Sequence, residues 1–257
     1  MAEPPDITEN HSADEAKHGT LDFYLTAPAP CPYLPAQEEQ RLLTFLDTPE
    51  KHAAMPALLR AGFRRSQNML YRPHCPNCNA CRSVRLRLHD FTPDAGQRRI
   101  GRKNASLHTT HETAQSSPEI AEIFDLFTRY QHSRHADGDM AHMTAADLAD
   151  MIAEHTGHAR MMMMRDSQNN LAAAMLYDAL PDGASAVYSF FDPALSAQSP
   201  GTAMILQLAE DTRKHGLPYL YLGYWIAASR KMQYKSRFQP LEILVENAWK
   251  EFDAASL

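Results

Sequence analysis

Three cysteines follow one another at a fixed spacing in the first third of the chain. Cys75, Cys78 and Cys81 are each separated by two residues, and Cys31 stands in a Cys-Pro-Tyr-Leu-Pro turn far upstream. Two-residue spacers bring thiolates onto one side of a tight turn, where three sulfur atoms can face one soft metal ion or cluster. The spacing therefore predicts one metal site that Cys31 closes, with a structural zinc ion and an iron–sulfur cluster as candidates. The alternative is a set of small buried thiols.

The cysteines belong to a chain with the composition of an ordinary soluble protein. Of 257 residues, 44% are hydrophobic and 22% charged, and no apolar run approaches the roughly 20 residues that cross a membrane. The N-terminus is acidic and polar, so we expect neither a secretion signal nor a membrane anchor, and residues 1–18 are predicted to be a disordered tail. These features predict a cytoplasmic protein, in which reduced cysteines favour a metal over disulfides.

Positive charge gathers around the cysteine motif, although the whole chain carries a net charge of −6. Between Arg60 and Lys103 there are eleven Lys and Arg against two acids, a local net of 11 − 2 = +9, while the remainder carries 14 − 29 = −15. Such a segment in an acidic protein favours a polyanion, first of all nucleic acid, over the alternative of a solvated basic face. The residues predicted to lie on its phosphates are Arg98, Arg99, Arg102 and Lys103.

The first half of the chain predicts short elements. A packed loop over residues 21–35 delivers Cys31, residues 40–46 fit a strand or a short helix, and residues 53–61 are typical of a helix that ends at Gly62. Residues 82–88 alternate between apolar and polar side chains, which predicts a half-buried strand with Arg85 and Arg87 on its polar face.

The second half predicts helices alternating with strands. Helix starts stand at Ser117-Pro118, at Thr144 and at Ser199-Pro200. Strands are predicted over residues 159–165, 171–180, 186–192, 219–225 and 241–245, with a basic loop or short helix over 229–238.

This order of elements resembles the acetyltransferase-type (GNAT) fold of acyl transferases. The turn from Gln198 to Ala203 matches the loose Q-x-x-G-x-A pattern of that superfamily, in which backbone N–H groups at a helix N-terminus receive a phosphate, and an ordinary capped helix is the alternative. We expect an α/β (α+β) protein. Its predicted parts are the tail (1–18), a small basic cysteine-bearing domain (19–110) and a GNAT-like transferase domain (111–257).

Several short motifs together resemble the aminoacyl-tRNA–protein transferases, in particular the bacterial branch that conjugates leucine. The likeness runs from about Asp22 to Phe252 and rests on residues 31–35, 62–66, 71–75 with Cys78 and Cys81, 97–99, 134–135, 221–226 and 231–235. It implies transfer of leucine from leucyl-tRNA to the N-terminal Asp or Glu of proteins, which marks them for degradation through the N-degron pathway. Eukaryotic relatives bind an iron–sulfur cluster through differently spaced cysteines.

An aminoacyl ester is already activated, so the enzyme has mainly to hold two substrates together and to manage protons, and no cofactor is required for the transfer. The candidates for proton handling are Asp137, Asp139 and Tyr224, and Lys231 and Lys235 are expected near the 3′ end of the tRNA. The alternative for each is structural: the two aspartates flank a turn glycine, and the tyrosine packs.

An acidic acceptor residue calls for a cation in its binding site, because an unpaired buried carboxylate is costly. The candidates are Arg85, Arg87 and Arg134, with contact to tRNA as the alternative role. Three other functions stay open: transfer of arginine from arginyl-tRNA, acetyl-CoA-dependent N-acetylation, and non-catalytic RNA binding by a metal-stabilised protein.

Overall fold

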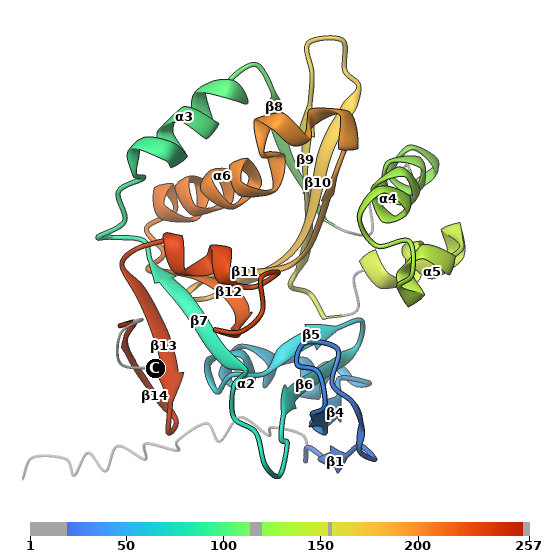
Figure 1. Cartoon of the computed structure of the whole chain (residues 1–257), viewed down its shortest axis with the longest axis vertical. Helices are drawn as coiled ribbons and strands as arrows, with labels where there is room; N and C mark the ends of the chain where they lie inside the picture. Colours follow the sequence, from blue (N-terminus) through green and yellow to red (C-terminus); the bar gives the residue numbers. More distant parts are fainter. Residues whose placement is uncertain (1–19, 114–119, 154–155, 254–257) are drawn as a thin grey trace, which may run out of the picture.

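The computed structural model describes residues 20–113, 120–153 and 156–253, so the predicted tail and the helix start at Ser117-Pro118 lie outside the described residues. An eight-stranded sheet with the order β14-β13-β7-β12-β11-β10-β9-β8 forms its centre (Figure 1). Within this sheet only β11 and β12 pair in parallel among the described strands. The strands are β7 (Arg82–Arg87), β8 (His108–Thr113), β9 (Ala159–Arg165), β10 (Leu171–Leu180), β11 (Gly183–Phe191), β12 (Tyr219–Trp225), β13 (Leu241–Val245) and β14 (Ala248–Glu251).

Helices cover both faces of the large sheet (Figure 1). The helices α3 (Ala95–Lys103) and α6 (Pro200–Lys214) lie on one face, and α4 (Ile120–Arg134) and α5 (Ala145–Ile152) lie on the other. Because successive side chains of a strand point to opposite faces, Met162 and Met164 pack on the α6 side and Met161 and Met163 on the α4 side. The methionine run therefore fills the core on both faces of the sheet. In the described part of the chain no helix is long and apolar enough to cross a membrane.

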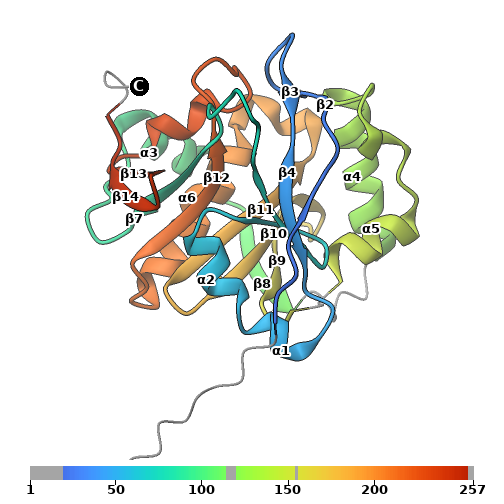
Figure 2. The same ribbon diagram turned by 90° about the horizontal axis from the view of Figure 1, so that it is seen from below.

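The N-terminal segment builds a smaller unit beside α4 and α5 (Figure 2). Its four-stranded sheet has the order β1-β4-β6-β5, and β2 and β3 form a separate pair. Its apolar side chains pack against Leu180 and Tyr221 of the large sheet. The elements are β1 (Tyr24–Leu25), β2 (Ala29–Pro30), β3 (Glu38–Glu39), β4 (Arg41–Phe45), α1 (Pro49–His52), α2 (Met55–Arg60), β5 (Arg64–Ser66) and β6 (Met69–Pro73).

Most of the locally encoded elements stand where the sequence predicts them. Thr144 and Asp147 form the capping box of α5, Gly216 follows α6 with a positive φ, and β12 is buried. The predicted α/β (α+β) class is confirmed. The change from the small sheet to the large one falls at the cysteine turn, however, because β7 pairs with β12 and β13 rather than with the strands before it.

Candidate active site

The two parallel strands of the large sheet diverge after a short paired stretch. Gly183–Ser185 of β11 pair with Tyr219–Tyr221 of β12, and beyond these residues the two strands no longer pair. Further along β11, Ser189 and Phe191 line a cavity of about 350 Å³. The rest of its wall comes from α4, from the 3-10 helix η3 (Pro193–Gln198), from the start of α6 and from the 3-10 helix η4 (Gln233–Arg237). These residues are Tyr130, Arg134, Ser196, Ser199, Gly201, Thr202, Ile205 and Tyr234. We call it the α6 pocket.

The N-terminus of α6 opens onto this pocket. Ser199 precedes the helix in the left-handed conformation, with φ 56°, and its side chain does not cap the helix. Ser199, Gly201 and Thr202 all line the pocket, so the positive end of the helix dipole lies at it. Pro200 has no N–H group, and those of Thr202 and Ala203 donate to the Ser199 carbonyl, which leaves the N–H group of Gly201 for a ligand among the described contacts. Such an end favours a phosphate or a developing oxyanion.

The basic helix α3 is bonded to the backbone that leads into the α6 pocket. Lys103 Nζ donates to the carbonyl of Ala197 at 2.8 Å, and Asn104 Nδ2 donates to that of Gln198 at 2.9 Å. A capping box between Asp94 and Gln97, which the sequence analysis missed, fixes the other end of α3. The predicted phosphate contacts Arg98, Arg99 and Arg102 are exposed on this helix. The structure therefore brings the basic cluster to the mouth of the α6 pocket.

Two arginines of β5 cross from the small unit to the large sheet. Arg65 Nε donates to Asp178 Oδ1 of β10 at 2.7 Å, with side-chain exposures of 1% and 0%. Arg64 Nη2 donates to the carbonyl of Ala186 on β11 at 2.6 Å, just beyond the residues that pair with β12. Neither arginine was assigned a role from the sequence. Their only signal there was the Gly-Phe-Arg-Arg-Ser motif, which does not reveal partners more than a hundred residues away.

Lys235, which the sequence analysis expected near the 3′ end of the tRNA, is buried within reach of the charge of Arg64. Its Nζ donates to the carbonyl of Tyr224 at 2.6 Å, and the side chain is 7% exposed. Burial, and after it the charge of Arg64, lowers the pKa of Lys235 to about 7. The Lys235 side chain thus belongs to the interior that supports β11 and β12, the two strands that diverge.

The lowered pKa of Lys235 predicts a dependence of stability on pH. Between pH about 7 and about 10 the unfolded chain keeps a proton on this amine that the folded protein loses, so the free energy of unfolding rises with pH across that window. We expect Lys235→Met to flatten this rise in urea unfolding, because methionine carries no proton. Parallel pH profiles for the two proteins would contradict the assignment.

Tyr224 lies in the same interior, where its hydroxyl is 3.0 Å from the carbonyls of Gly62 and of Tyr71. Burial raises its pKa well above the ordinary range. A hydroxyl has a single proton to donate, and here that proton bonds one of two backbone carbonyls of the small unit. The structure therefore gives Tyr224 a part in joining the small unit to the sheet.

The other predicted site residues of this region are exposed. Asp137 and Asp139 lie on the loop after α4, and neither lines the α6 pocket. Lys231 is exposed too. Burial is the main cause that lowers the pKa of His135, and the charge of Lys231 is the second. Arg134 does line the pocket: its guanidinium lies 5.6 Å from the ring centroid of Phe191.

Arg85 and Arg87 stand away from the α6 pocket. The predicted polar face is wrong for Arg85, which is 7% exposed because the rings of Tyr219, Tyr221 and Trp249 lie against it. Arg85 Nε lies 2.6 Å from Glu242 Oε2, and its guanidinium lies 3.5 Å from the ring centroid of Tyr219 and 4.3 Å from that of Trp249. Its bonding groups are therefore engaged within the protein. Arg87 pairs with Asp90 at 3.3 Å.

The four cysteines lie around one cavity of about 290 Å³ between the small unit and β7. Burial, followed by the proximity of Cys31, Cys75 and Cys78, raises the pKa of Cys81 to about 12. All four thiols are free and partly buried. No group of three or more His, Cys, Asp or Glu side chains in the described ranges is arranged to hold a metal ion as it stands. The chemistry of four soft sulfur donors around one cavity nevertheless fits a thiophilic metal.

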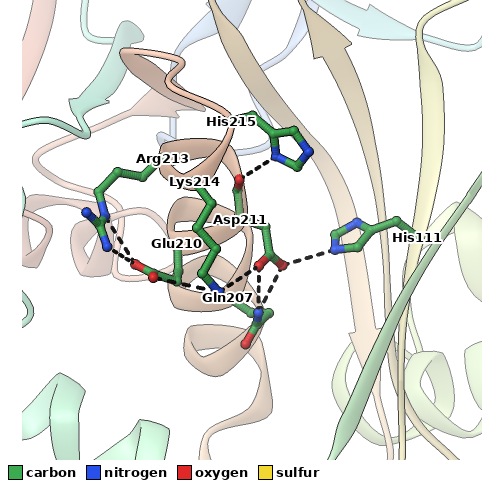
Figure 3. Close-up of polar contacts among 7 residues, drawn as sticks. All are labelled: His111, Gln207, Glu210, Asp211, Arg213, Lys214 and His215. Atoms are coloured by element: carbon green, nitrogen blue, oxygen red, sulfur yellow. Dashed lines mark hydrogen bonds and ion pairs between the residues drawn. The ribbon is translucent and has the colours of Figure 1, made fainter.

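A second polar cluster joins the outermost strand β8 to the far end of α6 (Figure 3). His111 Nε2 lies 3.0 Å from Asp211 Oδ2. Its Nδ1 lies 3.0 Å from the Tyr177 hydroxyl, which Figure 3 does not include. Gln207 donates to both carboxylate oxygens of Asp211. Because α6 runs from Pro200 to Lys214, this cluster lies near the end opposite the α6 pocket. It ties the outer strand to the helix.

Comparison with known proteins gives two family matches and close relatives. Aspartate/glutamate leucyltransferase of Paramagnetospirillum magneticum is 47% identical over 230 residues, which cover 90% of this chain and 93% of that protein. The protein of the same name from Parvibaculum lavamentivorans is 43% identical over 242 residues, 94% of this chain and 99% of that protein. Among solved structures, FemX has a TM-score of 0.49 and 8% identity, covering 87% of this chain and 86% of FemX.

The family matches cover both parts of the molecule. Residues 29–99 match the family described as "Arginine-tRNA-protein transferase, N terminus", and residues 122–245 match the corresponding "C terminus" family. The first match contains the four cysteines and the first half of α3, and the second contains the diverging strands and the α6 pocket. With both segments in one chain and in the same order, the chain belongs to the arginine-tRNA–protein transferase family.

Proposed function

We propose that this chain transfers leucine from leucyl-tRNA to the N-terminal Asp or Glu of proteins, and so marks them for degradation through the N-degron pathway. The relatives named above support the reaction, and one structural observation carries it: the basic helix α3 is bonded to the backbone that leads into the α6 pocket. A tRNA whose phosphates lie along α3 has its 3′ end beside the N-terminus of α6.

The chemistry needs positioning more than a reactive group. The neutral α-amino nitrogen of the acceptor attacks the ester carbonyl, an amide bond forms, and the bond to the tRNA 3′ oxygen breaks. The proton lost by the amine balances the proton gained by that oxygen. The N–H group of Gly201 and the positive end of the α6 dipole are suited to stabilise the negative oxygen that develops on the carbonyl. No covalent nucleophile is required.

The lining of the α6 pocket favours leucine over arginine as the transferred residue. Phe191, Ile205 and Tyr130 supply apolar wall, and no Asp or Glu is among the described residues that line it. Its cation, Arg134, would repel a guanidinium. An arginyl group would thus lose its hydration without gaining a partner, whereas a leucyl side chain meets apolar surface.

One assay separates this function from its alternatives. The purified protein is supplied with labelled leucyl-tRNA, arginyl-tRNA or acetyl-CoA, and with peptides that begin with Asp or with Ala. We expect label only from leucyl-tRNA and only on the Asp peptide. Label from arginyl-tRNA or acetyl-CoA would show that this compound, and not leucyl-tRNA, is the donor. Binding of tRNA without any transfer would point to the RNA-binding alternative.

We also propose that the four cysteines hold one structural zinc ion or iron–sulfur cluster, which would fix the turn from Cys75 to Cys81 to the segment around Cys31. The support is their common cavity. Anaerobically purified protein is expected to contain about one bound zinc ion or iron–sulfur cluster per chain, as measured by elemental analysis and absorbance. A chelator should then speed hydrogen exchange in that turn before it affects α6. Metal-free protein with an equally protected turn would contradict the proposal.

A further inference from the structure

The proposed reaction leaves open which cation receives the acidic side chain of the acceptor. Arg85 is engaged with Glu242 and two aromatic rings, and Arg87 with Asp90. Arg134 is exposed at the rim of the α6 pocket, where it also lies close to the expected path of the tRNA. A receptor that distinguishes a carboxylate from its neutral amide should be buried and already oriented.

Arg64 meets that description. It is 8% exposed, and its Nη2 donates to the Ala186 carbonyl at 2.6 Å. In the described part of the chain it forms no ion pair with a carboxylate, while its neighbour Arg65 takes Asp178. A guanidinium has five N–H groups, and one of those on Nη2 is engaged here. Of the other four, two are on Nη1 and one is on Nε. The charge of Asp178 reaches Arg64, but that carboxylate is bonded to Arg65, so the direct partner of the Arg64 guanidinium is a neutral carbonyl. A buried cation in such surroundings attracts an anion.

The backbone around Arg64 leaves room for its guanidinium. Gly223 of β12 has a φ of +82°, and a Cβ atom at this position would stand 3.3 Å from Nη2 and 3.4 Å from Nε of Arg64. A larger residue would therefore displace the guanidinium as well as strain the backbone. The glycine and the Ala186 carbonyl hold Arg64 between the two diverging strands.

The position of Arg64 relates directly to the α6 pocket. Ala186, which holds Arg64, and Ser189, which lines the pocket, are three residues apart on β11, a separation of about 10 Å along a strand. Tyr234 lies between the two regions: it lines the pocket, and its ring centroid is 5.9 Å from Nζ of the buried Lys235. The charge of Arg64 also contributes to the lowered pKa of Lys235.

We propose that Arg64 is the receptor for the side-chain carboxylate of the acceptor's N-terminal Asp or Glu. The acceptor then lies along the diverging part of β11, with its carboxylate at Arg64 and its α-amino group toward the ester in the α6 pocket. This inference rests on the proposed function and assigns its specificity to a residue of the small unit. It also explains why the small unit inserts a side chain between β11 and β12.

The test compares peptides that begin with Asp and with its neutral isostere Asn, using leucyl-tRNA as donor. We expect Arg64→Gln to lower kcat/KM for the Asp peptide by about 30-fold or more, and to leave kcat/KM for the Asn peptide and the affinity for tRNA within a few-fold. The matched control is Arg60→Gln, an exposed arginine of the same unit, which should keep the wild-type ratio of the two peptides.

A second variant guards against a folding defect at this buried position. Arg64→Lys keeps the charge but loses the planar fork, so we expect a smaller fall in the Asp-to-Asn ratio. Urea unfolding and tRNA binding establish that each variant is folded. An unchanged ratio in whichever variant folds overturns the assignment of Arg64, while the leucyl transfer itself stands. If the wild-type protein transfers no leucine to the Asp peptide, the proposed function fails and this inference falls with it.

Discussion

Asp178→Ala is expected to lower the free energy of unfolding by about 3–5 kcal/mol, because it leaves the guanidinium of Arg65 buried without its counter-charge. The pair joins β5 of the small unit to β10 of the large sheet, so the loss falls on the contact between them. Urea unfolding followed by circular dichroism measures the effect. Asp47→Ala, which removes a surface ion pair with Lys51, should leave the free energy of unfolding close to that of the wild type.

A double variant tells whether the charge itself is needed. Arg65→Met with Asp178→Leu removes both charges and fills the space with apolar side chains, and we expect it to recover most of the lost stability. Arg65 Nη2 and Asp178 Oδ2 have no partner in the described structure, so the pair does not satisfy all its polar atoms. A double variant as unstable as Asp178→Ala would show that the cost comes from packing instead.

Neutralising Arg99 and Arg102 together is expected to weaken tRNA binding roughly tenfold or more at physiological salt and to flatten the plot of log affinity against log salt by about one to two units. Both side chains are exposed on α3, while Arg98 and Lys103 bond to backbone carbonyls and are left in place to keep the helix seated. Fluorescence anisotropy with labelled tRNA over a range of KCl concentrations gives both quantities.

The control for this experiment removes the same charge elsewhere. Lys51→Gln with Lys250→Gln also changes the net charge by −2, but these lysines lie on α1 and β14 rather than on α3. We expect a salt slope close to that of the wild type. Equal slopes for the α3 variant and the wild type would remove α3 from the tRNA interface.

Elements with a complete local signal could be predicted from the sequence. Three elements are indicated by only a few neighbouring residues each. They are α5 with its capping box, the end of α6 with its basic last turn and glycine, and β12 with its all-apolar run. The outer strand β8 was missed because His108–Thr113 is polar and mostly exposed, and so shows no apolar alternation. The burial of Arg85 was missed because its partner Glu242 is 157 positions away.

The same limit applies to the candidate site. The cysteine spacing predicted that four thiols gather, and the basic cluster predicted a phosphate surface, since both signals are local. The roles of Arg64, Arg65 and Lys235 depend on Ala186, Asp178 and the Tyr224 carbonyl, which only the fold brings near them. A run of basic residues does not reveal which of its members turn inward.

The place of β7 in the sheet has a consequence for how the chain is made. β7 emerges from the ribosome early, yet its two neighbours begin only at Tyr219 and Leu241. At about 5–20 residues per second, this inner strand waits for roughly ten seconds with both edges unpaired. During that time the small unit can fold, but the unpaired edges of β7 need protection from pairing with other strands. A chaperone is suited to give that protection. Ribosome-arrested chains that end before Tyr219 should therefore be cut by protease within β7, whereas the finished protein should not.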